Sequence, residues 1–160
     1  MRSDKYFPLS ELSVRITREK NRGRTIALAN GGFDLIHVGH IRYLQAAKAM
    51  ADILVVALNS DASLRRLKGR QRALIDQRGR VAIIAALECV DYVTLFAQQR
   101  VDRVLLALRP DIHCKGSDYS VATVPEREVV RGYGGRIAIV GGAKVRSTSQ
   151  IIQRIRESFA

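Results

Sequence analysis

The sequence of 160 residues has few of the features that mark secreted, membrane or disulfide-stabilised proteins. It contains only two cysteines, Cys89 and Cys114, and their spacing matches neither a metal site nor a disulfide framework. No apolar run approaches the roughly 20 residues of a membrane span, and the first five residues do not lead into an apolar signal core. We therefore expect a cytoplasmic protein that has two reduced, semi-buried thiols and makes no membrane contact.

Two common phosphate-binding motifs are also absent. There is no Gly-x-x-x-x-Gly-Lys-(Ser/Thr), which excludes the phosphate cradle of P-loop enzymes. There is no Gly-x-Gly-x-x-Gly after the first apolar run, which argues against a dinucleotide-binding dehydrogenase. No serine or cysteine occupies a nucleophile elbow, so acyl transfer is not indicated.

Acidic residues are scarce relative to basic ones, 15 against 27, and the formal net charge is +12. Such a balance is frequent in proteins that bind nucleic acid. Seven basic residues lie between positions 65 and 80, but no aromatic residue is interleaved among them to stack on bases. We interpret most of these side chains as a solvated basic face, and nucleic acid is not the partner that we expect.

Apolar runs of strand length alternate with amphipathic stretches along the chain. The pattern predicts strands over 25–29, 53–58, 92–96, 111–114 and 136–140, and helices over 9–20, 41–51, 62–67, 78–88, 98–108, 125–133 and 149–158. Several strands are rich in Val, Ile and Leu without alternation, which is typical of parallel strands buried on both faces. The expected fold is α/β, a Rossmann-like doubly wound parallel sheet of about five strands. We expect one domain over 1–160, with an N-terminal helical extension at 1–23 and a core at 24–158.

Polar clusters follow four of the expected strands, at 31–40, 59–61, 115–118 and 141–148. In a doubly wound sheet the carboxyl ends of the strands meet at one edge, and ligands bind there. The first cluster places His37 and His40 at a strand-to-helix turn, where free backbone N–H groups favour phosphate. Imidazoles can hydrogen-bond a phosphate and, when protonated, offset the charge on its oxygens. Gly39 leaves room for a ligand near the backbone, so the cluster predicts a nucleotide site with its own catalytic groups.

The segment His37-Val38-Gly39-His40 resembles the His-x-Gly-His loop of the nucleotidyltransferase superfamily. From about residue 25 to 155 the chain is similar to the adenylyltransferase domain of the ADP-heptose synthases. The segments that carry this resemblance are 30–34, 59–63, 66–69, 86–91, 115–119 and 147–152. The resemblance implies transfer of AMP from ATP to a sugar 1-phosphate, a heptose 1-phosphate, with release of pyrophosphate. The ADP-sugar formed would be a precursor of the lipopolysaccharide core. The resemblance also implies Mg²⁺ on the phosphates and a possible homodimer.

The resemblance further implies roles for individual residues. The expected catalytic residues are His37, His40 and Lys68, which would hold the triphosphate and stabilise charge at its α-phosphorus. The expected nucleotide-binding residues are Asn30, Gly31, Gly32, Phe33, Gly39, Arg80, Lys115, Gly116, Ser147 and Thr148. The expected substrate-binding residues are Asp34, Asn59, Asp61 and Asp118. Arg78 is an alternative for the phosphate contact of Arg80. No side chain is expected to bind the metal.

Other interpretations stay open at this point. The protein could be a cytidylyltransferase that uses CTP and a polyol or amino-alcohol phosphate. It could also be a non-catalytic basic domain that binds nucleotides or nucleic acid, which would account for the charge of +12 directly. Among single residues, Asp34, Asn59 and Asp61 could serve as turn and helix caps, and His113, inside an apolar strand, is expected to be structural.

Overall fold

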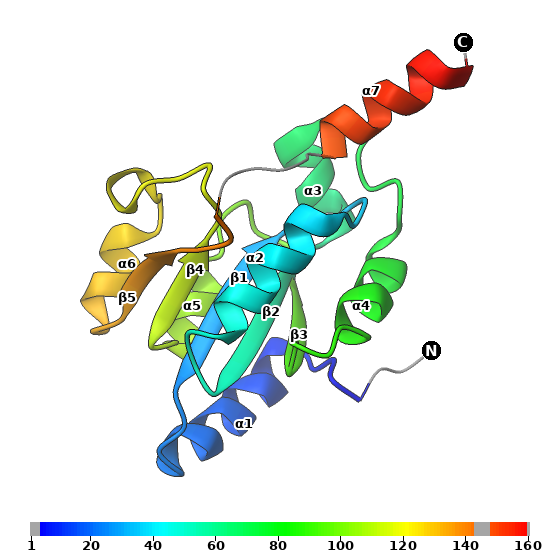
Figure 1. Ribbon diagram of the computed structural model, residues 1–160. Helices are drawn as coiled ribbons and strands as arrows, with labels where there is room; N and C mark the ends of the chain where they lie inside the picture. The colour runs from blue at the N-terminus through cyan, green and yellow to red at the C-terminus, as the bar shows by residue number, and fades with distance from the viewer. Residues whose placement is uncertain (1–3, 143–147, 160) are drawn as a thin grey trace.

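The computed structural model describes residues 4–142 and 148–159. Its centre is a sheet of five parallel strands (Figure 1): β1 (Ile26–Gly31), β2 (Ile53–Asn59), β3 (Tyr92–Phe96), β4 (Ile112–Lys115) and β5 (Arg136–Ile139). The strand order is β3-β2-β1-β4-β5, and every neighbouring pair is parallel. The predicted α/β fold with a parallel, doubly wound sheet is confirmed.

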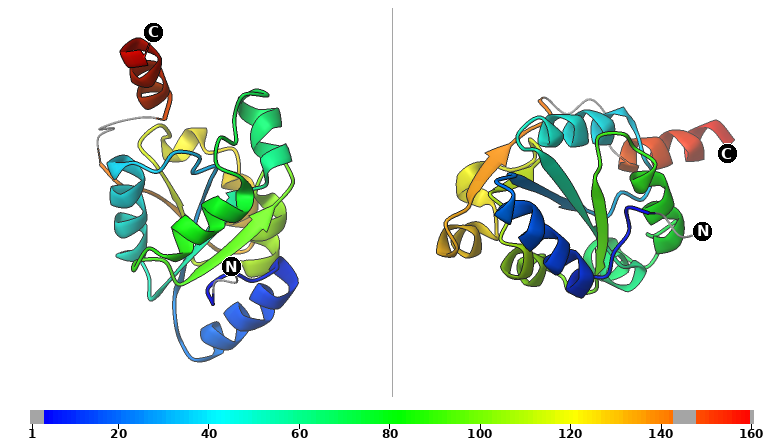
Figure 2. Two further views of the ribbon diagram at one scale, coloured as in Figure 1. Left: turned by 90° about the vertical axis from the view of Figure 1, so that its right-hand side faces the viewer. Right: turned by 90° about the horizontal axis from the view of Figure 1, so that it is seen from below.

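Helices cover both faces of this sheet (Figure 2). They are α1 (Leu9–Asn21), α2 (Val38–Lys48), α3 (Asp61–Lys68), α4 (Gln77–Ala85), α5 (Asp102–Leu108), α6 (Arg127–Gly132) and α7 (Thr148–Phe159), with a short 3₁₀ turn at Val121–Thr123. Helix α7 extends away from the other helices (Figure 1), and it contains no buried residue among those described. None of the helices in the described ranges has the length and apolar character of a membrane span.

Strands β1, β2 and β4 are buried on both faces, which explains why their apolar residues do not alternate with polar ones. Along β1, Ala27 and Ala29 belong to a core cluster with residues of α2 and α4. Ile26 and Leu28 belong to a second cluster with residues of α1, α5 and α6. Successive side chains of a strand point to opposite faces, so a strand with a core on each side needs apolar residues throughout.

Helix α1 contributes to the second of these clusters. Leu12 and Ile16 have 0% and 1% of their surface exposed and pack with residues of α5. The segment before the helix is also attached to the sheet, because the N–H of Phe7 donates a hydrogen bond to the carbonyl of Val93 at 3.0 Å. The amino-terminal helix therefore shares the hydrophobic core of the sheet.

The helix expected over 98–108 begins later than its sequence pattern indicated. Residues 98–101 form a bend, and α5 starts only at Asp102. The carbonyls of Ala97 and Gln98 accept hydrogen bonds from side chains of α3, at 2.5 Å from Arg66 and 2.7 Å from Ser63. These carbonyls are occupied by α3 rather than by the N–H groups of a longer helix, and the bend crosses the carboxyl end of the sheet.

The strand order places the switch point of the sheet between β1 and β4. The chain leaves β1 toward α2 on one face, and it leaves β4 toward α6 on the other face. A crevice therefore opens beyond the carboxyl ends of these two strands, which is where ligands bind in sheets of this type.

Candidate active site

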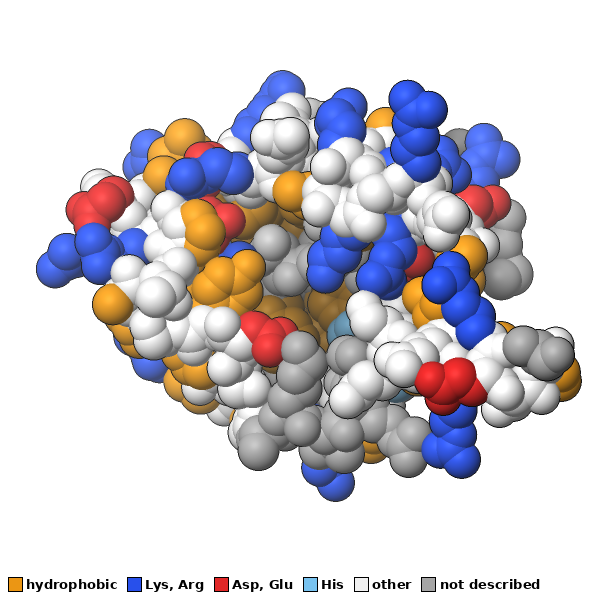
Figure 3. All heavy atoms as spheres, turned by 90° about the horizontal axis from the view of Figure 1, so that it is seen from above, with side chains coloured by type: hydrophobic (Ala, Val, Ile, Leu, Met, Phe, Trp, Pro, Cys, Tyr) orange, Lys and Arg blue, Asp and Glu red, His pale blue; other side chains and the backbone are white. Residues whose placement is uncertain are grey.

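A cleft of about 860 Å³ lies at the carboxyl ends of the strands. Figure 3 looks down into it and shows a hollow with a histidine at its floor and lysine and arginine side chains along one wall. Most of the site residues expected from the sequence line it: Asn30, Gly31, Gly32, Phe33, Asp34, His37, Gly39, His40, Asn59, Lys68, Lys115, Gly116, Asp118 and Thr148. Two expected residues, Asp61 and Arg80, do not line it. Ser147 lies outside the described residues.

The two histidines of the first loop lie together in this cleft. His37 is the residue immediately before α2, and its Nδ1 accepts a hydrogen bond from the N–H of Gly39 at 3.1 Å. This bond holds the His37 ring against the helix start. The rings of His37 and His40 are stacked, with centroids 3.9 Å apart and an angle of 29° between their planes. Both imidazoles can thus reach a single anion.

The surroundings of His40 keep its imidazole neutral in the ligand-free cleft. Burial, followed by the charges of His37 and Lys68, lowers the pKa of His40 to about 4. Its Nδ1 is buried and has no hydrogen-bond partner among the described residues. A bound polyphosphate would bring negative charge to the same place and would favour protonation of the ring. His40 therefore has both a vacant hydrogen-bonding atom and a protonation state that an anion can shift.

Lys68 completes the cationic side of the loop. It is the last residue of α3, is exposed and lines the cleft. Gly69 follows it with a φ of +99°, a conformation that favours glycine and lets the chain leave the helix sharply. Lys68 is thus placed at a helix end, beside a turn, where its ammonium acts on His40.

The glycines of the first loop are closely packed, Gly32 against Leu64 of α3 and Gly31 against Phe33. A Cβ on Gly32 would lie 2.6 Å from Cδ1 of Leu64. A Cβ on Gly31 would lie 3.0 Å from the ring of Phe33, which itself has a φ of +47°. The backbone of this loop therefore lies directly beside α3, and its exposed side faces the cleft.

Asp34 lines the cleft, but its carboxylate is committed to the protein backbone. Only 5% of the residue is exposed. Its two oxygens accept hydrogen bonds from the N–H groups of Ala73 and Ile75, each at 3.1 Å. Asp34 therefore fastens the segment between α3 and α4 to the first loop, and the substrate contact expected for it stays a prediction.

Arg80 lies beneath the cleft, where its guanidinium is surrounded by protein acceptors. The residue is 0% exposed. It donates hydrogen bonds to the carbonyl of Ile75 at 3.1 Å, the carbonyl of Gly32 at 2.6 Å and Oδ1 of Asp61 at 2.7 Å. This arrangement differs from the phosphate contact expected from the sequence, because the helix turns Arg80 inward. Arg78 on the same helix is exposed and does not line the cleft.

The segment after β2 also has a structural part in the fold. Asn59 is 5% exposed, and its Nδ2 donates a hydrogen bond to Oγ of Ser63 at 2.9 Å. The cap of α3 is neither Asn59 nor Asp61 but Ser60, whose Oγ accepts a hydrogen bond from the N–H of Ser63. Both of the neighbouring polar residues thus orient α3, and with it Lys68.

A buried polar chain lies at the β4 side of the cleft. Oδ1 of Asn30 is 3.0 Å from Nε2 of His113 and 3.0 Å from Nζ of Lys115. Lysine can only donate hydrogen bonds, so the shared Asn30 atom is an oxygen and His113 also donates to it. His113 is 0% exposed, and burial together with the charge of Lys115 lowers its pKa to about 3. His113 is therefore a neutral, internal residue, in line with the structural interpretation of its sequence position.

Several cleft residues were not found by sequence reasoning. The cleft is also lined by Arg42, Tyr43, Arg72, Arg100, Tyr119 and Glu126. Arg100 follows the carboxyl end of β3, a position from which the sheet topology alone would have suggested it. Glu126 lies inside the helix expected over 125–133, and nothing in the sequence marked it as a cleft residue.

A comparison with known proteins identifies the family. The chain matches the cytidylyltransferase-like family over residues 28–158. It belongs to that family. It is 50% identical over 151 residues to the bifunctional protein HldE of Citrifermentans bemidjiense, covering 94% of this chain and 31% of that protein. It is 46% identical to the bifunctional protein HldE of Geobacter sulfurreducens, with the same coverage. The chain therefore spans about a third of the length of these curated relatives.

A solved structure has the same architecture. The lipopolysaccharide core biosynthesis protein from Thermoplasma volcanium superposes with a TM-score of 0.65 and is 29% identical in sequence. The match covers 78% of this chain and all of the other chain. The cytidylyltransferase-like fold thus extends over most of the sequence described above.

Proposed function

We propose that this protein is a nucleotidyltransferase that transfers AMP from ATP to a sugar 1-phosphate, a heptose 1-phosphate by resemblance to the ADP-heptose synthases. Its products would be pyrophosphate and an ADP-sugar. The observation that carries the proposal is the stacked pair of His37 and His40 in a cleft at the switch point of the sheet. Membership of the cytidylyltransferase-like family and identity with bifunctional HldE proteins support this chemistry.

The reaction would be an in-line displacement at phosphorus. A phosphate oxygen of the sugar 1-phosphate forms a bond to the α-phosphorus of ATP while the bond to the bridging oxygen breaks and pyrophosphate leaves. His37 and His40 would hydrogen-bond the phosphate oxygens, and Lys68 would offset the charge that develops on them. No covalent enzyme intermediate is needed, because holding the two substrates in line accounts for much of the rate.

Magnesium would enter with the nucleotide. Mg²⁺ commonly binds phosphate oxygens and water together with few protein ligands. Lys68, His37 and His40 line the cleft and would hold the triphosphate that carries the ion. The ion would supply charge neutralisation on the triphosphate, and the side chains would supply orientation.

The resemblance supports two further expectations. We place the reaction in the cytoplasm, where ATP is available, and we expect the protein to pair as a homodimer. Sedimentation equilibrium of the purified chain tests the second expectation, since a monomer over the micromolar range would contradict it.

The experiment that tests the proposed function is a panel of phosphorylated sugars and alcohols incubated with Mg²⁺ and either ATP or CTP. We expect pyrophosphate release with ATP and a sugar 1-phosphate, and none from a His37→Ala variant that retains its circular dichroism spectrum. Release with CTP and a polyol phosphate would instead favour a cytidylyltransferase. No release with any pair, together with salt-sensitive binding to duplex DNA, would favour a basic binding domain.

A further inference from the structure

The seven basic residues between positions 65 and 80 do not form a uniform solvated face. Lys68 and Arg72 line the cleft, and Arg80 is buried beneath it. The four others are exposed and do not line the cleft: Arg65, Arg66, Arg70 and Arg78. Arg72 is therefore the cleft residue of this run to which the proposed function gives no role.

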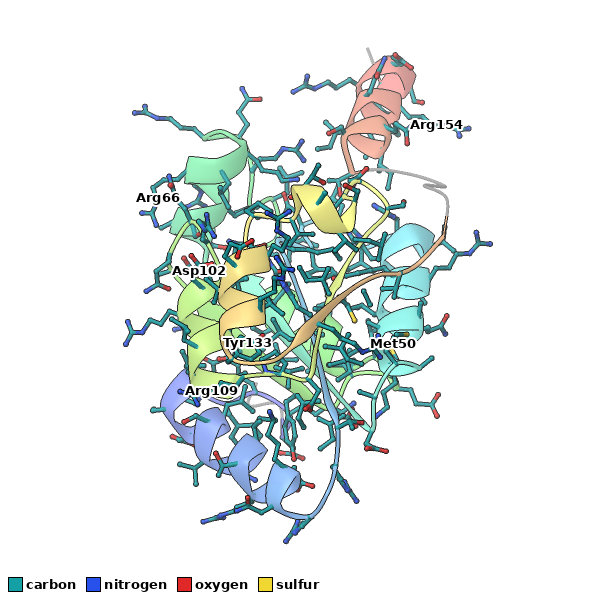
Figure 4. The ribbon with its side chains drawn as sticks, turned by 90° about the vertical axis from the view of Figure 1, so that its left-hand side faces the viewer. Met50, Arg66, Asp102, Arg109, Tyr133 and Arg154 are labelled. Carbon is teal, nitrogen blue, oxygen red and sulfur yellow. The ribbon has the colours of Figure 1, made fainter. Side chains whose placement is uncertain are left out.

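Arg66 shows how a basic side chain of the same run is used away from the cleft. It lies at the outer side of α3 (Figure 4), where its Nη2 donates a hydrogen bond to the carbonyl of Ala97. Arg154 of α7 also lies at the outer surface, on the opposite side of the molecule in this view (Figure 4). The positive charge of the cleft thus comes from a few selected residues and not from the basic surface as a whole.

The backbone beside Arg72 is fixed to the loop that carries the histidine pair. The N–H of Ala73, the next residue, donates a hydrogen bond to Oδ2 of Asp34 at 3.1 Å. Ala73 has a φ of +62°, a conformation that residues other than glycine rarely adopt and that persists where surrounding contacts enforce it. Asp34 lies three positions before His37, so the chain at Arg72 is held directly beside the histidine loop.

The side chain of Arg72 is attached to the same region. Arg72 is half-buried, and its Nη2 donates a hydrogen bond to Oγ of Ser149 at 2.9 Å. Ser149 follows Thr148, whose Oγ1 donates a hydrogen bond to the carbonyl of Leu35 at 3.4 Å. Leu35 is the neighbour of Asp34 in the histidine loop. Contacts at both the backbone and the side chain therefore hold the guanidinium at this part of the cleft.

The charge of Arg72 is not balanced by a described carboxylate. Within 4–142 and 148–159, none lies within ion-pair distance of its guanidinium. The carboxylate of Asp34 accepts hydrogen bonds from backbone N–H groups, and Ser149 offers Arg72 a neutral hydroxyl. A guanidinium carries five N–H donors in a planar fork, which matches the oxygens of a phosphate. Arg72 thus has the charge and the geometry of a phosphate ligand.

We propose that Arg72 is a further substrate-binding residue, whose guanidinium binds phosphate oxygens beside the histidine pair while Ser149 directs it into the cleft. This inference rests on the proposed function and deepens it. The phosphate belongs to ATP or to the sugar 1-phosphate, because the reaction brings both to the histidine loop. In either case Arg72 and Lys68 offset phosphate charge from the α3 side of the cleft.

The test compares Arg72→Met with Arg70→Met, a matched control that removes the same charge from an exposed position two residues away. Each variant is assayed by pyrophosphate release, with ATP and a heptose 1-phosphate varied in turn. For Arg72→Met we expect KM to rise about 10- to 100-fold for the substrate whose phosphate it binds. A rise for ATP assigns the nucleotide phosphate, and a rise for the sugar 1-phosphate assigns the acceptor. Arg70→Met should behave as the wild type.

Two further variants separate phosphate binding from the contact with α7. Arg72→Lys keeps the charge without the planar fork, so it should recover part of the lost affinity. Ser149→Ala removes the contact with Arg72 but keeps the guanidinium, so it should raise KM much less than Arg72→Met does. Thermal melts accompany the assays. If Arg72→Met melts early, Arg72→Lys is compared with Arg70→Met in its place.

Two results overturn the inference and leave the proposed function intact: KM values in the Arg72 variants that equal those of Arg70→Met, or a rise in Ser149→Ala as large as that in Arg72→Met. Calorimetric titration with ATP and with the sugar 1-phosphate distinguishes the opposite case. Binding of either compound that is lost in Arg72→Met but kept in Arg70→Met supports the role of Arg72. If the wild type then releases no pyrophosphate, the proposed function is overturned while the role of Arg72 stands.

Discussion

Charged side chains in two layers of the same site differ in whether a ligand can reach them. In the layer that lines the cleft, which we call the rim layer, Lys68 is exposed and the two histidines face the ligand space. In the layer beneath, Arg80 and Asp34 are almost completely buried, and protein atoms occupy their hydrogen-bonding groups. The rim residues are available to a ligand, whereas the lower layer fixes the loops that carry them.

This difference between the two layers shows that a charged residue close to a catalytic motif need not contact substrate. Arg80 bridges Ile75, Gly32 and Asp61, so it joins the segment after α3, the first loop and the start of α3. A ligand role and a bracing role predict different outcomes for substitution. Substitution of a rim residue should change turnover and leave stability unchanged. Substitution of a residue of the lower layer should lower stability, and any change in turnover should follow from that loss.

The largest expected effect is on the rim. His40→Ala removes an imidazole from the phosphate site and should lower kcat by about 10³-fold, because stabilisation of the transition-state charge is lost. Steady-state pyrophosphate release measures the effect, and the melting temperature should change little. Turnover close to that of the wild type in the folded variant would remove the histidine pair from the mechanism.

The next largest effect is expected in the lower layer. Arg80→Met leaves the half-buried Asp61 carboxylate and two carbonyls without their donor, and it should lower the free energy of unfolding by about 3–5 kcal/mol. Urea denaturation measures this change. Lys68→Met is the matched control, an exposed cation whose loss should alter stability by less than about 0.5 kcal/mol while reducing activity. If Arg80→Met kept its stability and only raised KM for ATP, Arg80 would be the phosphate ligand that the sequence suggested.

A smaller loss of stability is expected when one of the hydrogen bonds that hold the segment between α3 and α4 is removed. Asp34→Asn turns an NH₂ group toward one of the two backbone N–H donors, which should cost about 1–3 kcal/mol. The segment should then open more often, and trypsin should cut faster at Arg70 and Arg72. Asp118→Asn, at the exposed edge of the cleft, is the control, and equal cleavage rates in the two variants would contradict the bracing role.

A pH-dependent effect of similar size tests whether His113 is neutral in the folded protein. The pKa of His113 is about 3 in the folded protein and about 6.5 in an unfolded chain. The unfolded state therefore binds more protons between these pH values, and stability falls as the pH decreases below 6.5. At pH 5 this amounts to about 2 kcal/mol. Unfolding at pH 5 and pH 7 measures it, and the slope should be shallower in His113→Phe. A slope equal to that of the wild type would show that His113 does not titrate as described.

Much of the fold could be predicted from the sequence because its local patterns agree with its tertiary structure. The strand over residues 92–96 was predicted with the bounds that β3 has, and the others differ by one or two residues at an end. Apolar runs without alternation indicated strands with a core on each side, and that is where the two clusters lie. The start of α5 was wrong, because side chains of α3 bind the carbonyls that precede it.

The sequence by itself determined the order of strands and helices, the histidine loop after β1 and the collection of polar clusters at one edge of the sheet. Only the tertiary structure decided that Arg80 and Asp34 face inward and that Glu126 joins Lys115 at the cleft. The physical reason is the range of the interactions. A strand or a helix start depends on neighbours in sequence, whereas the burial of a charge depends on partners such as Gly32 for Arg80, which are 48 positions away.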